Sequence, residues 1–335
     1  MPPRIPPRTD RPRVGLVLGS GGARGIVHLS VLGALQAMDI PIDLIAGSSI
    51  GAVAAGVHAV GRLADLEEDI LGMKRDEFLR LFDPVLSRSG LFAGKRALAF
   101  LARYIPRQAC IEDLPVPLGI VATDFDTGRP VIFRTGNLLE ALRASVSIPG
   151  IFTPTVAGRS LLLDGGVSNP LPIDVARSMG ADLTIAVSLQ PALGKLGLIP
   201  VRRGPARKKA GGAKPESRVP PVERLVHRLI ENGSGAPNGP LRAADLWLDT
   251  RRAGEDAKRK MPNLFEILTR TIDIMEYANT RLMLETNPPT VLIQFELPEI
   301  PTLDFSMGAF LLEEGRKAAE AKRPELIRKI KQAVP

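Results

Sequence analysis

Two stretches decide the fold: VGLVLGSGGARG at residues 14–25 and IDLIAGSSIG at residues 42–51. In each stretch, a short apolar run of strand length ends in a glycine-rich turn. Residues 26–38 follow the first turn with helical spacing, and the small residues of 52–60 follow the second turn in the same way. A strand, a turn and a helix in that order, repeated, predict a parallel α/β sheet.

The rest of the chain extends this sheet. Residues 62–105 have a largely helical pattern. Further elements are predicted as strands at 116–122, 130–134, 160–163, 183–189 and 291–297 and as a helix at 174–179. Two amphipathic helices are predicted near the C-terminus, one from the spacing of Leu264, Leu268, Thr271, Met275, Ala278 and Leu282, and one at 310–334 that is interrupted near Pro324.

Composition excludes several classes of protein. The chain has 335 residues, of which 44% are hydrophobic and 24% are charged, and these values exclude wholesale disorder, collagen and coiled coil. The single cysteine, Cys110, excludes a disulfide framework and a cysteine-rich zinc site. The N-terminal sequence MPPRIPPRTDRPRV has proline and arginine where a secretory signal needs an apolar core, so we expect a cytoplasmic protein.

The net charge of +8 is gathered in a few segments, chiefly residues 1–13 and 201–228. Such segments suit an anionic partner, either a membrane surface or nucleic acid, and solvated tails explain them equally well. Nucleic acid is the less favoured partner, because residues 201–228 contain no aromatic side chain to stack on bases. A peripheral contact with the inner membrane face is therefore the partner hypothesis to test, and the sequence indicates no oligomeric state.

The sharpest motif is Gly47-Ser48-Ser49-Ile50-Gly51, which matches G-x-S-x-G between a strand and a helix. That turn is too tight for side chains beside the serine, so glycines flank it and the Ser49 hydroxyl projects above the helix N-terminus. Backbone amides and the helix dipole can stabilise negative charge there. Ser49 is thus a candidate nucleophile, and the alternative is a close-packed glycine turn with a capping serine.

The second motif is GSGGARG at residues 19–25, again between a strand and a helix. It fails as a dinucleotide fingerprint, because Arg24 stands where glycine is required, and it lacks the Gly-Lys-Ser/Thr of a P-loop. Successive small residues leave several N–H groups free to converge on one oxygen, which predicts an anion-binding nest. A plain tight turn is the alternative.

The third motif is Leu163-Asp164-Gly165-Gly166, a carboxylate at the end of a predicted strand. A serine hydroxyl needs an adjacent base to accept its proton. The three histidines are poorly placed for that role. His28 and His58 precede the aspartate, contrary to the order typical of a Ser, Asp, His hydrolase, and His227 lies in the basic segment 201–228, which is predicted to be mobile. Asp164 is therefore the candidate base; Asp124 and Asp126 are alternative carboxylates, but their DFDTG context predicts a hairpin turn.

With these motifs in this order, the chain resembles the bacterial branch of the patatin-like phospholipase family. GSGGARG is similar to its oxyanion loop, GSSIG to its nucleophile elbow and LDGG to its catalytic aspartate motif. The intervening ATDFDTGRPVIFRTG, LRASVSIPGIFTP and VSNPLPIDVARSMGAD are similar as well. The resemblance implies a three-layer α/β/α fold with a mostly parallel central sheet.

The resemblance also divides the chain into four parts. These are a flexible basic arm at residues 1–13, a catalytic domain at 14–190, a mobile Gly/Pro-rich basic insertion at 191–262, and a C-terminal helix–strand–helix segment at 263–335 that packs on the catalytic domain. The insertion matches nothing in the family.

Carried over residue by residue, the resemblance implies a Ser49–Asp164 dyad that needs no metal or organic cofactor. The oxyanion would be held by the N–H groups of Gly21 and Gly22, with Ser20 or Ala23 assisting, while Arg24 and Gly25 support the loop. Family members often have glycine at the place of Ser20, but serine still offers a backbone N–H, so this departure is minor.

The implied function is hydrolysis of lipid carboxylic esters, as in a phospholipase A or lysophospholipase. The alternatives are an acyltransferase that uses the same acyl-enzyme, and a non-catalytic lipid-sensing regulatory protein. A lipid substrate needs an apolar groove, and the predicted helices of 66–105 offer walls for one, although such residues are more often core: Phe78, Leu79, Leu81, Phe82, Leu91, Phe92, Phe100 and Leu101.

Overall fold

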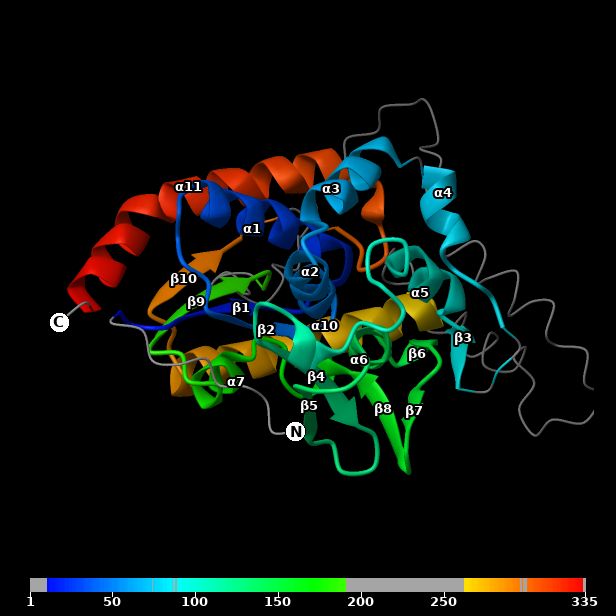
Figure 1. Ribbon diagram of the computed structural model, residues 1–335. Coiled ribbons are helices and arrows are strands. Elements are labelled where there is room, and N and C mark those ends of the chain that lie inside the picture. Colours follow the sequence, from blue (N-terminus) through cyan, green and yellow to red (C-terminus); the bar gives the residue numbers. More distant parts are fainter. Residues whose placement is uncertain are drawn as a thin grey trace, which may run out of the picture. The chain divides into compact units, whose positions relative to one another are not determined.

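The computed structural model describes residues 11–73, 75–85, 87, 89–190, 262–295, 297 and 300–333 (Figure 1). Contacts divide the chain into two compact units, Met1–Arg207 with Asp273–Pro335, and Lys208–Ile272. The sheet and the site described below belong to the first unit. Of the second unit, the structure describes residues 262–272, which contribute the start of helix α10 (Leu264–Thr286).

An eight-stranded mixed sheet forms the centre of the first unit. Five strands run parallel in the order β10-β9-β1-β2-β4, and β8, β7 and β5 are added with antiparallel pairing. Their bounds are β1 (Val14–Leu18), β2 (Leu44–Ser48), β4 (Leu118–Asp124), β5 (Pro130–Phe133), β7 (Thr155–Ala157), β8 (Ser160–Asp164), β9 (Leu183–Ser188) and β10 (Val291–Gln294).

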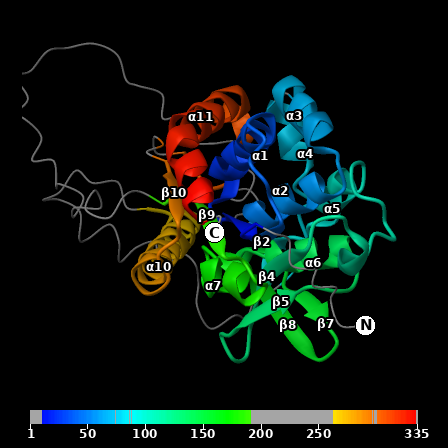
Figure 2. The ribbon, with the colours of Figure 1, turned by 60° about the vertical axis from the view of Figure 1, so that its left-hand side comes forward.

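Helices cover both faces of this sheet, which makes the predicted three-layer α/β/α architecture (Figure 2). One face carries α1 (Val27–Ala37), α2 (Ile50–Ala59), α6 (Leu138–Ser145) and α11 (Gly308–Ala333). The other face carries α7 (Ile173–Ser178) and the part of α10 from Asp273 onward. Successive strand residues alternate between the two cores: Leu16 and Leu18 pack on the first face, and Val17 packs on the second. Apolar residues at every strand position are typical of a sheet buried on both sides.

The pairing of β4 brings two distant strands into line. Its residues 118–121 pair with β2 and its residues 122–124 pair with β8, while β5 pairs with residues 120–123 from the opposite side. Strands β2 and β8 therefore pair with the same edge of β4, β2 along its first part and β8 along its last part. This arrangement places the end of β2 beside the end of β8.

The segment 62–105 is less regular than predicted. It contains α3 (Leu63–Gly72), α4 (Arg75–Arg80) and α5 (Lys95–Leu101), but also β3 (Gly90–Phe92), which pairs with β6 (Gly150–Phe152) in a separate two-stranded sheet. A three-residue strand has too few positions to display a period, so the helical prediction missed it.

Helix α11 continues through Pro324, contrary to the predicted interruption. Ala319 and Leu326, on either side of the proline, are fully buried, and this packing holds the helix together despite the lost N–H. Within the part of the chain that the structure describes, no helix is long and apolar enough to cross a membrane.

Residues 11–13, predicted in the flexible arm, belong to the folded body. The Arg11 guanidinium donates to both carboxylate oxygens of Asp43, at 2.7 and 2.9 Å, and the Arg13 N–H donates to Asp182. The remainder of the arm and residues 191–261 of the insertion lie outside the described residues.

Candidate active site

Ser49 lies at the turn between β2 and α2, with φ 54° and ψ −124°. This backbone conformation is unfavourable for a residue with a side chain, and close packing imposes it. A Cβ atom at Gly47 would lie 2.7 Å from Ala52 Cα, and one at Gly51 would lie 2.2 Å from the Leu18 carbonyl oxygen. The two glycines of the motif are therefore needed for the turn itself.

Ser145 of α6 fixes the main chain at Ser49, the candidate nucleophile. The Ser49 N–H donates to Ser145 Oγ at 2.9 Å, and that hydroxyl donates to the Val121 carbonyl of β4 at 2.6 Å. The strained turn is thus tied to the centre of the sheet.

The structure brings Ser49 and Asp164 together. Ser49 Oγ donates to Asp164 Oδ2 at 2.6 Å, and Asp164 Oδ1 accepts from the Gly166 N–H at 2.7 Å. Both residues are buried, with 4% of Ser49 and 3% of Asp164 exposed. Because the carboxylate has little contact with water, its two hydrogen bonds fix its orientation toward the hydroxyl.

Burial raises the pKa of Asp164 to about 7, even though the hydrogen bonds from Ser49 and Gly166 oppose this shift. A base with a pKa near the working pH is effective, because it is ionised often enough to accept a proton and acidic enough to return it.

In the loop at residues 19–25, two of the four predicted oxyanion donors already have hydrogen-bond acceptors. The Ser20 N–H donates to the Pro170 carbonyl and the Ala23 N–H donates to the Thr302 carbonyl, both at 2.8 Å. Ser20 and Ala23, predicted to assist as oxyanion donors, are therefore already engaged elsewhere. The N–H groups of Gly21 and Gly22 make no hydrogen bond within the described residues.

Arg24 and Gly25 hold this loop in place. Arg24 Nε donates to the Gly21 carbonyl at 3.1 Å, and its Nη2 donates to Asp273 of α10 at 2.9 Å. A Cβ atom at Gly25 would lie 2.1 Å from Ile50 Cγ2, so this glycine allows the loop to close on the start of α2.

The histidines do not pair with Ser49 in the described residues. His28 is fully buried and its Nε2 lies 2.7 Å from the Gly19 carbonyl oxygen, which can only accept, so Nε2 carries the proton. Burial lowers the pKa of His28 to about 4. His58 lies at the far end of α2 from Ser49, and His227 lies outside the described residues.

The alternative carboxylates Asp124 and Asp126 stand in the turn between β4 and β5, as expected from DFDTG. Asp124 accepts hydrogen bonds from the N–H and the hydroxyl of Thr127, and these bonds lower its pKa. Asp124 caps its own turn and makes no bond to Ser49.

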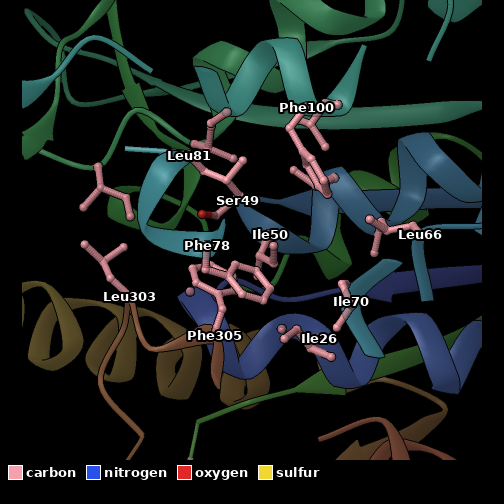
Figure 3. Close-up of a pocket in the computed structure, with 18 of the residues that line it drawn as sticks. Ile26, Ser49, Ile50, Leu66, Ile70, Phe78, Leu81, Phe100, Leu303 and Phe305 are labelled. Carbon is pink, nitrogen blue, oxygen red and sulfur yellow. The ribbon is translucent and has the colours of Figure 1, made fainter. Parts of the chain in front are cut away.

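A cavity of about 170 Å³ opens beside Ser49 (Figure 3). Among the described residues that line it, Ser49 supplies the only polar side chain. The walls come from residues 22–29, α2, α3, α4, α5 and the segments around Ile148 and Phe305. Of the predicted wall residues, Phe78, Leu81, Phe82, Phe100 and Leu101 line the cavity, whereas Leu79, Leu91 and Phe92 do not. The site thus joins one reactive hydroxyl to an apolar chamber.

Sequence reasoning missed the contribution of α10. Its predicted apolar positions are largely exposed, including Met275 at 37% and Leu282 at 57%. The side of the helix that meets the site carries polar residues one turn apart: Asp273 binds Arg24, Glu276 lies against Gly166, and Asn279 donates to the Val167 carbonyl at 2.9 Å. The i, i+3, i+6 spacing of these three residues is the sequence signal that could have found them.

Comparisons with known proteins identify the family of the chain. The patatin-like phospholipase family matches residues 16–177. An uncharacterized NTE family protein of Mycobacterium tuberculosis is 34% identical over 93% of this chain and 91% of its own length. Patatin-like phospholipase domain-containing protein 6 of Mus musculus is 34% identical over 52% of this chain and 13% of its own length.

A solved structure, VipD from Legionella pneumophila, is 14% identical with a TM-score of 0.43 and covers 96% of this chain and 67% of its own. The Mycobacterium relative matches nearly from end to end, and the family match spans all three motifs. The chain belongs to the NTE family of patatin-like phospholipases.

Proposed function

We propose that this protein is a serine lipid acyl hydrolase of the phospholipase A or lysophospholipase type, which acts through a Ser49–Asp164 dyad. The observation that carries the proposal is the 2.6 Å hydrogen bond from Ser49 Oγ to Asp164 at the polar end of an apolar cavity. The family to which the chain belongs supports the same reaction class, because its members are lipid hydrolases.

In the first half-reaction, the acyl chain of the substrate occupies the cavity and its ester carbonyl lies over Ser49. Ser49 Oγ forms a bond to the carbonyl carbon while its proton passes to Asp164 Oδ2, and the carbonyl oxygen becomes an oxyanion. The N–H groups of Gly21 and Gly22 hold this oxyanion, each contributing about 3 kcal/mol to the transition state. The C–O bond to the alcohol then breaks, and Asp164 returns the proton to the departing oxygen.

In the second half-reaction, water attacks the acyl-enzyme. Asp164 accepts a proton from the water as the new C–O bond forms, and the same donors hold the second oxyanion. The bond from the carbonyl carbon to Ser49 Oγ then breaks, and Oγ recovers its proton from Asp164. The fatty acid leaves and the dyad returns to its starting state.

Fluorophosphonate labelling tests the proposal directly. We expect the wild type to be labelled, Ser49→Ala to lose the label, and Asp164→Asn to be labelled at least about 100-fold more slowly. Ser145→Ala is not a suitable control, because Ser145 holds the Ser49 main chain. Ser89→Ala is suitable, because Ser89 is exposed and its hydrogen bonds go to Ser87. Persistent labelling of Ser49→Ala would contradict the site assignment.

Substrate comparison completes the test. Lysophosphatidylcholine, a diacyl phospholipid and a p-nitrophenyl ester are offered to the wild type, and release of free fatty acid is measured. Fatty acid released from any lipid ester supports hydrolysis, whereas transfer of the acyl group to an added alcohol without free acid supports the acyltransferase alternative. A protein that binds lipid but turns over none of these esters contradicts both enzyme proposals.

We further propose that the enzyme works at the inner membrane face, where basic residues of the segments 1–10 and 201–228 meet anionic lipid. Each cation near such a surface contributes about 1 kcal/mol. Sedimentation with anionic and neutral vesicles at low and high salt tests this contact. Equal sedimentation with anionic and neutral vesicles would contradict the proposed contact with anionic lipid.

A further inference from the structure

Beside the dyad lies a second carboxyl group that the reaction above does not use. Glu276 of α10 is buried, with 7% exposed. The position that a Cβ atom would occupy at Gly166 lies 2.2 Å from Glu276 Oε1 and 3.1 Å from Asp164 Oδ1. The two carboxyl oxygens therefore border the same point beside Gly166.

Two carboxylates so close together and so poorly hydrated cannot both be ionised at neutral pH, because each charge opposes the other in a low dielectric. The hydrogen bonds determine which of them takes the charge. Asp164 receives two short bonds, from the Ser49 hydroxyl and the Gly166 N–H. Glu276 receives a longer bond at 3.1 Å from Gln190 Nε2, and the Ser20 side chain gives its charged form only a minor further stabilisation. The first negative charge of the pair therefore rests on Asp164.

We propose that Glu276 is a positioning residue of the dyad, which acts as a neutral carboxylic acid while Asp164 is the ionised base, and whose own ionisation stops the reaction. The inference rests on the proposed function, because it assigns Glu276 a role through Asp164. Its carboxyl group packs on Gly166, and the Gly166 N–H in turn orients the Asp164 carboxylate. Glu276 thereby helps to hold Asp164 in its position beside Ser49.

Ionisation of Glu276 adds a second negative charge behind the oxyanion loop. Ser20 Cβ lies 3.0 Å from the same Cβ position at Gly166, so this charge faces the loop as well as the base. A negative charge there opposes formation of the oxyanion in both half-reactions. The groups that face Glu276 are Asp164 of β8, Ser20 and Arg24 of the loop, Gln190 after β9, and Asp273 on its own helix.

The titration order follows from this arrangement. Burial, and after it the neighbouring Asp164 charge, together raise the pKa of Glu276 to about 8, although Arg24 opposes the shift. The pair thus loses its first proton near the pKa of Asp164 and its second at higher pH. Activity requires the singly ionised pair, so we expect a bell-shaped dependence of rate on pH.

The rate of Ser49 labelling by a fluorophosphonate, measured from about pH 5 to pH 10, tests the inference. We expect the wild-type rate to rise through the first ionisation and to fall at least about 10-fold from its maximum above the second. Glu276→Gln keeps the shape of the acid but cannot ionise, so it should keep the rising limb and lose the falling one. Glu285→Gln, the same change on an exposed position of α10, is the matched control and should follow the wild type.

A wild type without a falling limb, or a Glu276→Gln variant that retains it, would overturn the inference. A wild type that is not labelled at any pH would instead overturn the proposed function. A second measurement keeps Glu276 and removes its charged neighbour. In the Asp164→Asn variant, the infrared band of the protonated Glu276 carboxyl group is followed as a function of pH and compared with that of the wild type. Loss of the neighbouring charge should move this titration to lower pH by one unit or more, and an unchanged titration would contradict the coupling.

Discussion

Ser48 and Asp164 occupy successive places along one edge of β4, opposite Val121 and Ala122. Between them lies Gly165, where a Cβ atom would stand 2.3 Å from the Val121 carbonyl oxygen and 2.7 Å from Ser48 Oγ. The two strands that lead to the proposed nucleophile and base therefore meet with no room for a side chain at the junction. The hydrogen bond of the dyad is a direct result of this strand alignment.

Gly165→Ala should consequently separate the dyad. The added methyl group meets backbone of β4, which cannot move without shifting the sheet, so Asp164 is displaced from Ser49. A displacement of about 1 Å lowers kcat by about 100-fold. Gly72→Ala is the control, because nothing lies within 4 Å of a Cβ atom there and the change should be neutral or slightly stabilising. Ester hydrolysis at saturating substrate measures both, and equal activity of the two variants would contradict the alignment.

Asp164→Asn should stabilise the protein at alkaline pH while it inactivates the enzyme. The folded-state pKa of Asp164, about 7, lies above its ordinary value of 3.8, so the native state prefers the protonated form. The stability that this preference contributes is complete below pH 3.8 and is lost as the pH rises through about 7. At pH 9 the wild type must keep a buried negative charge on Asp164, whereas asparagine is neutral. The free energy of unfolding of the Asp164→Asn variant at pH 9 should therefore exceed that of the wild type by about 1–3 kcal/mol. Urea unfolding at pH 5 and pH 9 checks this, and a gain equal at both values would show another cause.

Leu66→Trp should shorten the acyl chain that the enzyme accepts. Leu66 lines the cavity on α3, well away from Ser49 (Figure 3). A larger side chain there fills space that a long chain needs, so kcat/KM for long-chain p-nitrophenyl esters should fall at least about 10-fold relative to short-chain esters. Leu71→Trp, on an exposed neighbour outside the cavity, should leave the ratio unchanged. A uniform loss for all chain lengths would show that the chain binds elsewhere.

Arg24→Lys should weaken the oxyanion loop without removing its charge. A lysine ammonium cannot copy the planar guanidinium, which reaches the Gly21 carbonyl and Asp273 together. We expect kcat to fall about 10-fold with little change in KM, because the loop acts on the transition state. If the two residues act as one bridge, Asp273→Asn should add little further loss in the Arg24→Lys background. Fully additive losses would contradict the bridge.

The sequence was sufficient to predict the three motifs and most strands of the sheet. Each motif is a local turn, so its pattern is contained in a few consecutive residues. Gly47 and Gly51 could be assigned to a tight elbow before any contact was known, and the structure shows the backbone atoms that exclude a side chain from both positions. The pairing of Ser49 with Asp164, 115 residues apart, was predicted from the lack of a suitably placed histidine and from the family resemblance, not from a local pattern.

Other features depended on contacts between distant residues, which no local pattern contains. The N–H groups of Ser20 and Ala23 looked as available as those of Gly21 and Gly22 until Pro170 and Thr302 were found to accept from them. Glu276 was hidden for a related reason: polar positions beside an apolar stripe predict a solvated helix face, and here the apolar stripe is the exposed one.

The cavity wall and the proposed catalytic centre are built from largely different parts of the chain. Ser49, Asp164 and the glycine loop are set by the edge of the sheet, whereas α3, α4 and α5 form much of the chamber and contribute nothing to the dyad. Engineers who seek a new ester specificity can therefore redesign those three helices while the reactive end is left untouched. On the proposed function, substitutions in these helices alter the acyl chain that is accepted and leave the bond-breaking groups in place.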